Sequence, residues 1–277
     1  MPERDLESIA AALPAVRALF PTHAAFGEAT VADVLGPALA RARRLEVTTL
    51  ATTLFLNRGD HFLAVPLPQE AQFATALAAC VGDLDGDGRE DVFLSQNFFA
   101  TQDKTPRCDA GLGLWLRGDG RGGLTAVAAH ESGVRVYGEQ RAAALADFDG
   151  DGRVDLAVTQ NGNATKLYRN VRGQPGLRVR LQGPPGNPTA VGAVICGRAG
   201  DAWGPARMVG AGSGYWSQNS AVEVLAMAEP VRRLRVLWPG GNETQVQVPE
   251  HAREVVLGMD GGLRVVSPEP PPTKKRR

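Results

Sequence analysis

Two short stretches of the chain carry four aspartates each at the same spacing. Positions 1, 3, 5 and 9 of residues 83–91 and of residues 147–155 are all Asp. The side chains are Asp83, Asp85, Asp87 and Asp91 in the first loop and Asp147, Asp149, Asp151 and Asp155 in the second. Alternate positions of a tightly curled loop turn toward one centre, where about six to eight oxygens can surround a hard cation at roughly 2.3–2.6 Å. The spacing predicts a Ca²⁺ site in each loop.

Other positions of the two loops fit the same chemistry. The backbone carbonyl at position 7, Arg89 or Arg153, is predicted to supply another oxygen ligand. Gly88 and Gly152 stand at position 6, where a sharp turn needs a residue without Cβ. Carboxylates this close repel one another unless a cation lies among them or protons are taken up. We therefore expect both loops to be unfavourable when empty.

The loops differ from the helical calcium hand at position 12. That motif has a bidentate glutamate there, whereas this chain has Leu94 and Val158, each within a strand-like segment. The alternative is that Asp-Gly pairs only form hairpin turns. A turn needs two such residues, not four spaced acids occurring twice. The sequence therefore favours calcium loops that connect strands.

The acidic loops belong to an internal repeat. Residues 76–97 and 141–161 are similar, and their first aspartates lie 64 residues apart. Each copy reads as strand, acidic loop and strand, followed by another short strand in GLWLRGDG or TKLYRNV. A sheet of three or four strands repeated at this interval suits a β-propeller blade, since neighbouring blades must cover its faces.

The flanking regions have different patterns. Residues 1–44 are predicted as a helical connector with a capping box at Thr30 and Asp33, and strand-like alternation starts at Leu45, with a hairpin turn at residues 57–60. Propeller repeats are predicted over 45–172, a small β domain over 177–266 and a disordered basic tail over 267–277. The predicted fold is all-β: a partial β-propeller, then a sandwich-like or barrel-like domain, after a short helical N-terminal segment.

Motifs in both β regions resemble known families. DLDGDGRED and DFDGDGRVD, each followed by a strand ending in Gln-Asn, resemble the FG-GAP or VCBS repeats of integrin-type propellers. LRVRLQG, NPTAVGA, GSGYWSQNS and VLWPGG resemble the ASPIC/UnbV domain that follows such repeats in cartilage acidic protein and in bacterial secreted proteins. VLAMAEP replaces the Phe-Gly-Leu-Gly-like stretch usual in that domain. The resemblance implies a calcium-binding, extracellular or periplasmic protein acting in adhesion or recognition.

A propeller of this type takes about seven blades. The chain shows two complete acidic loops and one preceding hairpin, so further blades and a secretion signal are expected upstream in a longer parent chain. The N-terminal residues lack the basic start and continuous apolar run of a signal peptide. No window is long and apolar enough to predict a membrane span.

Composition narrows the class of partner. Basic and acidic residues both number 30, and four of the basic ones end the chain, so the body is slightly acidic and is not expected to bind nucleic acid. No nucleophile elbow, phosphate-binding glycine loop or paired zinc spacing occurs, so the chain is not expected to be an enzyme. The expected partner is a protein or a glycan, or further blades.

Two weaker signals have simple structural explanations. Arg58-Gly59-Asp60 and Arg117-Gly118-Asp119 spell an integrin-ligand tripeptide but are expected to be hairpin turns. Tyr215 and Trp216 suit a platform for a sugar ring, but core packing is the favoured expectation, as it is for the other tryptophans.

Three functions are compatible with these patterns. The favoured one is a calcium-stabilised, non-enzymatic scaffold or recognition module. The second is an accessory protein in a biosynthetic pathway, as the UnbV resemblance implies, and a cleft with perturbed acids outside the loops would favour it. The third is a non-functional C-terminal fragment of a longer propeller protein.

Overall fold

The computed structural model describes residues 4–102 and 105–266, so the predicted tail lies outside the described residues. The chain forms two compact units, Met1–Leu50 and Ala51–Arg277. It is mostly β with few helices, and its small sheets are arranged like propeller blades, as predicted.

The first unit is a set of short helices around a small apolar core. Its core side chains are Leu6, Val16 and Phe26. The elements are α1 (Leu6–Ala12), α2 (Val16–Leu19), α3 (His23–Glu28), α4 (Val31–Leu35) and the 3₁₀-helix η1 (Gly36–Arg41). Pro14 separates α1 from α2 and Pro21 separates α2 from α3, since proline has no N–H to donate to a helical hydrogen bond. The predicted capping box is present: Thr30 and Asp33 each accept a hydrogen bond from the backbone N–H of the other.

The second unit begins with a two-stranded hairpin, β1 (Thr53–Asn57) and β2 (Phe62–Pro66). Residues 45–52 were predicted as strand but form none, which corrects the sequence prediction. The partner strand ends at Pro66, and Pro68 follows it before the 3₁₀-helix η2 (Gln69–Gln72), so no strand is available to pair with residues 45–51. Leu45 and Leu50 are consequently exposed. The first Arg-Gly-Asp tripeptide lies in the hairpin turn, as expected.

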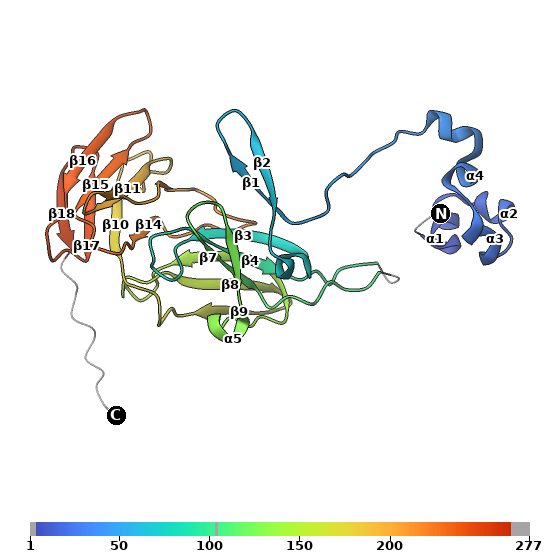
Figure 1. The fold of residues 1–277 in the computed structure, drawn as a ribbon, viewed down its shortest axis with the longest axis horizontal. Helices are drawn as coiled ribbons and strands as arrows, with labels where there is room; N and C mark the ends of the chain where they lie inside the picture. Colours follow the sequence, from blue (N-terminus) through green and yellow to red (C-terminus); the bar gives the residue numbers. More distant parts are fainter. Residues whose placement is uncertain (1–3, 103–104, 267–277) are drawn as a thin grey trace, which may run out of the picture. The chain divides into compact units, whose positions relative to one another are not determined.

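Two antiparallel meanders follow, and each contains one acidic loop (Figure 1). The first comprises β3 (Ala76–Gly82), β4 (Asp91–Gln96), β5 (Leu114–Gly118) and β6 (Leu124–Val127). The second comprises β7 (Glu139–Ala146), β8 (Asp155–Asn161) and β9 (Asn163–Tyr168), and the short helix α5 (Ala129–Ser132) lies between the meanders. Each acidic loop joins the first two strands of its meander, as the repeat predicted.

The two meanders bury a shared core. Cys80 and Phe93 of the first lie in one cluster with buried residues of the second, namely Ala143, Leu145, Leu156 and Val158, together with Val134 and Val136 of the connection. The Cys80 thiol donates a hydrogen bond to the carbonyl of Ala143 (2.9 Å). Neighbouring sheets therefore cover each other's faces, which is the packing that propeller blades need.

Two further sheets enclose a single core in the C-terminal part of this unit. One has the order β14 (Val222–Leu225), β10 (Leu177–Gln182), β17 (Glu254–Gly258) and β18 (Leu263–Val266). The other has β12 (Ala202–Trp203), β11 (Val194–Ala199), β15 (Arg233–Leu237) and β16 (Glu243–Gln247), with β13 (Arg207–Met208) also paired to β11. Val179, Ile195, Leu234 and Leu257 are completely buried between them. We call these sheets the C-terminal β layer pair.

The segment between β9 and β10 binds both acidic loops. The Asn170 amide nitrogen donates to the carbonyls of Leu84 (2.6 Å) and Val154 (3.0 Å). Backbone N–H groups of Gln174 and Gly176 donate to carbonyls in the first and second loop respectively, both at 2.8 Å. This segment therefore fixes the loops relative to each other and to β10.

Asn170→Ala should destabilise the second unit by about 1–3 kcal/mol, because two loop carbonyls would lose their amide donor. The exposed Asn163 caps only its neighbour Ala164, so Asn163→Ala is the matched control and should have a small effect. Urea unfolding of the three proteins measures this difference. Equal midpoints for the two variants would show that Asn170 does not hold the loops.

Candidate functional site

The first aspartate of each acidic loop is buried and organises the loop backbone. The side chains of Asp83 and Asp147 are each 1% exposed. Asp83 accepts hydrogen bonds from the N–H groups of Gly86 (2.7 Å) and Gly88 (2.9 Å). Asp147 accepts from the equivalent glycines at 2.8 Å each. The two loops thus have the same conformation, as their sequence repeat predicts.

The glycines of the loops are needed for this conformation. Gly88 and Gly152 have φ of +86° and +85°, a region that favours glycine. A Cβ on Gly86 would also lie 2.2 Å from the carbonyl oxygen of Gln174. Position 6 is therefore the sharp turn that the sequence predicted.

Position 9 connects each loop to the third strand of its meander. Asp91 accepts from the backbone N–H of Leu84 (3.0 Å) and of Gly118 (2.9 Å) at the end of β5. Asp155 makes the same pair of contacts in the second loop, to Phe148 (2.9 Å) and Asn170 (2.6 Å). These two aspartates hold three consecutive strands in register at the loop end.

Three carboxylates converge in each loop. Asp83, Asp85 and Asp91 each place an oxygen within 4.8 Å of the others, and so do Asp147, Asp149 and Asp151. Oxygens bound to one ion at about 2.4 Å cannot lie more than about 4.8 Å apart, so each cluster could hold a metal ion. The remaining aspartates, Asp87 and Asp155, lie outside these groups.

Arginines neutralise the same carboxylates. Asp83 and Asp147 pair with Arg207 (3.5 Å) and Arg178 of the C-terminal β layer pair. At position 3, Asp85 pairs with Arg117 (2.7 Å) and Asp149 pairs with Arg169. At position 5, Asp87 pairs with Arg89 (3.6 Å) and Asp151 pairs with Arg153 (3.0 Å), and both of these arginines stand at position 7. Each contact engages only Oδ2 of the aspartate. A metal ion would therefore share or replace these cations.

Sequence reasoning did not predict these ion pairs, although one signal was present. Leu116 and Tyr168 pair with equivalent residues of the second strand, so Arg117 and Arg169, which follow them, hold equivalent places at the end of the third strand. The second Arg-Gly-Asp tripeptide lies where β5 ends, as expected of a turn, but its arginine faces the acidic loop.

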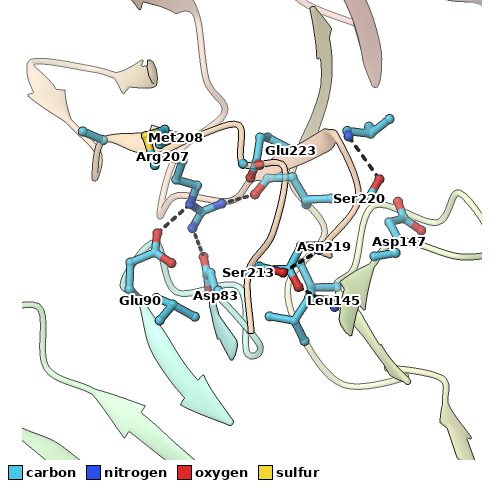
Figure 2. Close-up of a pocket in the computed structure, with 18 of the residues that line it drawn as sticks. Asp83, Glu90, Leu145, Asp147, Arg207, Met208, Ser213, Asn219, Ser220 and Glu223 are labelled. Atoms are coloured by element: carbon cyan, nitrogen blue, oxygen red, sulfur yellow. Dashed lines mark hydrogen bonds and ion pairs between the residues drawn. The ribbon is translucent and has the colours of Figure 1, made fainter. Parts of the chain in front are cut away.

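A buried charge cluster adjoins the first loop. Arg207 donates to Glu90 (2.6 Å) and to the carbonyl of Val224, and also contacts Asp83 (Figure 2). Burial raises the pKa of Asp83 to about 6 even though Arg207 opposes the shift. Burial likewise raises the pKa of Glu223 to about 7, with Arg207 lowering it and Glu90 raising it. The cluster has more carboxylates than one guanidinium can neutralise.

A cavity of about 340 Å³ lies between the loops and the C-terminal β layer pair. Asp83 and Glu90 line it from the first loop, and Asp147 lines it from the second. Strands β13 and β14 and the loop between them complete the wall, with the polar side chains of Arg207, Ser213, Asn219, Ser220 and Glu223 (Figure 2). The cavity joins parts of the chain far apart in sequence, and its charged lining residues are four carboxylates and one arginine.

The predicted burial of the tryptophans is right for Trp238 and wrong for Trp203 and Trp216. Trp238 is 2% exposed, in the core of the C-terminal β layer pair. Trp216 is 89% exposed and Tyr215 is 43% exposed, because both stand at the tip of the loop between β13 and β14. Core packing is therefore wrong for this pair.

One family of known proteins is similar to part of the chain. A model of the ASPIC and UnbV family matches residues 183–262. The match includes Arg207, Ser213, Asn219 and Glu223, so it contains one wall of the cavity. No curated protein matches the chain. Among the described residues, no helix has the length and apolarity needed to cross a membrane.

The pH dependence of stability tests the buried position of Glu223. The pKa of Glu223 is raised in the folded protein, so the folded protein keeps a proton that the unfolded chain releases. The proton stabilises the folded state fully below about pH 4, and this stabilisation is lost as pH rises through about 7. Glu223→Gln mimics the neutral form, so its stability relative to wild type should improve between pH 5 and 8, on the order of 2 kcal/mol.

Thermal unfolding in chelator at several pH values measures this difference. Glu229→Gln, at an exposed glutamate of the same region, is the control and should show no such trend. A gap between Glu223→Gln and wild type that stays constant with pH would mean that Glu223 ionises as an ordinary surface carboxyl.

Proposed function

We propose that this chain is a calcium-binding, non-enzymatic scaffold or recognition module of an extracellular or periplasmic protein. The observation that carries the proposal is the convergence of three aspartates in each of two equivalent loops. The blade-like meanders and the resemblance of both loops to FG-GAP or VCBS repeats support it, as does the ASPIC and UnbV match. The partner is a protein or a glycan.

Calcium is favoured over other metals by the donor set. Each cluster offers carboxylate oxygens only, without the histidine or cysteine that zinc and copper prefer. The predicted ligands also include Asp87 of the first loop and Asp155 of the second, which lie outside the clusters, and the carbonyls of Arg89 and Arg153. Calcium accepts such irregular, flexible ligand shells more readily than magnesium does.

Calcium bound in these loops would stabilise the folded meanders. Position 1 folds the loop and position 9 holds the third strand, so an ion bound among these carboxylates would fix three strands together. The arginine pairs reduce the affinity, because they compete for the same oxygens. A weak site suits an extracellular protein, where calcium reaches millimolar concentration and sites bind at roughly 10⁻⁴–10⁻³ M.

Calorimetry with calcium should find two sites, and Asp85→Asn or Asp149→Asn should each remove one. These position-3 aspartates are more exposed than the buried first aspartates, so the variants should still fold. Calcium at 100 times its Kd should add about 2.7 kcal/mol per site to the free energy of unfolding. Asp201→Asn, at a fully exposed aspartate, should keep both sites. Absence of binding heat and of any rise in Tm in millimolar calcium would refute calcium binding.

Arg169→Gln should tighten calcium binding at the second loop a few-fold, because Arg169 pairs with both Asp149 and Asp151. The Asp85→Asn background isolates this loop in calorimetry. Arg172→Gln removes the same charge from a side chain that donates to the carbonyl of Glu131 and not to an acidic loop, and it should change the Kd less. Equal changes in the Kd of the two variants would mean that net charge, and not the ion pair with the loop, determines the affinity.

An accessory role beside biosynthetic enzymes is a second candidate, favoured by the cavity. Glu223 lies outside both loops, lines the cavity and has a pKa raised to about 7 by burial, a combination common at functional sites. Native mass spectrometry of protein purified from its own host tests this role. A small molecule that is retained by wild type and lost in Glu223→Gln would favour the accessory role over the scaffold.

A further inference from the structure

An exposed aromatic pair stands at the tip of the loop between β13 and β14. The rings of Tyr215 and Trp216 are nearly parallel, at 4°, with centroids 5.5 Å apart. Trp216 is 89% exposed, and its φ of +49° is unusual for a large side chain. Such a conformation costs free energy, so it is retained where surrounding structure enforces it.

The base of this loop is fixed to both meanders. Asn219 Oδ1 accepts a hydrogen bond from the N–H of Leu145 in β7 (2.9 Å), and the N–H of Ser220 donates to the Leu145 carbonyl (2.9 Å). Gly214 lies against Ala79 of β3, since a Cβ at this position would be 3.4 Å from its carbonyl oxygen. The N–H of Ser213 donates to the carbonyl of Ser217 (3.0 Å), which closes the tip. The aromatic pair is thus held on a braced loop.

The same loop brings hydrogen-bonding groups to the cavity. Ser213 and Asn219 line the cavity, and Figure 2 shows them beside each other on one wall. Ser213 Oγ accepts from the N–H of Asn219 (2.6 Å), so its hydroxyl proton is available. Within residues 4–102 and 105–266, no acceptor binds the Asn219 amide nitrogen and no donor binds the Glu223 carboxylate. Donors and an acceptor are therefore available in one cavity wall.

We propose that the aromatic pair and the adjoining cavity wall bind a neutral oligosaccharide. This inference rests on the proposed recognition function and names its ligand class. A sugar ring has an apolar face that packs on an aromatic ring and hydroxyls that both donate and accept hydrogen bonds. Trp216 supplies the platform, and Ser213, Asn219 and Glu223 supply the polar contacts.

Charge decides between classes of ligand. Residues 208–222 contain no charged side chain, and four carboxylates line the cavity against Arg207. An anionic polysaccharide or nucleic acid would be repelled. Protein interfaces are dominated by clusters of large anchor side chains, whereas small residues, mainly glycine and serine, surround the aromatic pair in this loop. A neutral sugar is not repelled by the carboxylates and can bind to a single exposed aromatic pair.

Calorimetry and tryptophan fluorescence with neutral hexasaccharides test the proposal. The probes are cellohexaose, laminarihexaose, mannohexaose and chitohexaose, with an alginate hexamer as the anionic counter-probe. At least one neutral probe should bind wild type, and Trp216→Ala should weaken that binding about tenfold or more, with Trp216→Phe retaining part of it. Trp203→Ala is the matched control, because Trp203 is partly exposed in β12 and contacts Arg198 and Arg235 instead.

Each outcome decides the proposal. No binding of any neutral probe, equal binding by wild type and Trp216→Ala, or equal binding of alginate would overturn it. The calcium-dependent rise in Tm is measured on the same proteins. A rise in Tm in calcium without sugar binding would refute the sugar site and leave the calcium proposal intact. Sugar binding without a rise in Tm in calcium would support the sugar site and refute the calcium proposal.

Discussion

Burial of negative charge is the constraint on which this structure depends. Asp83 and Asp147 have almost no exposure, yet each stands among several other carboxylates. Buried charge must be paired, protonated or bound to metal. Arg207 and Arg178 pair with Asp83 and Asp147. Burial raises the pKa of Asp83 and of Asp91 to about 6, so both take up a proton more readily than an exposed aspartate does. Calcium would be a third solution at the same oxygens.

This constraint links the meanders to the C-terminal β layer pair. Arg207 of β13 and Arg178 of β10 each reach across to the first aspartate of one loop, and each also binds a glutamate, Glu90 or Glu254. Removing one partner of such a buried network leaves an uncompensated charge, which costs more than the pair contributes. The two parts are therefore held together by charge pairing as well as by the segment around Asn170.

The local features of this fold were predictable from sequence, and the long-range ones were not. Eight spaced aspartates and the turn glycines specify the loops because each loop is one short continuous segment. Arg207 and Arg178 lie 124 and 31 positions from the aspartates they contact, so only the folded chain brings these pairs together. Strand alternation in residues 45–52 was misleading because a strand also needs a partner, and Pro66 and Pro68 end the available one.

The aromatic pair illustrates a different limit of sequence reasoning. Tyr215 and Trp216 were expected in a core because large apolar residues in small β domains are usually buried. Their segment is rich in glycine and serine, which favours a tight turn over a strand, so the rings are carried to the tip. The loop's base lies in the cavity wall near Arg207, the residue that neutralises Asp83. Arg207 therefore belongs to two features at once, because the guanidinium that neutralises the first loop also lines the cavity below the aromatic pair's loop.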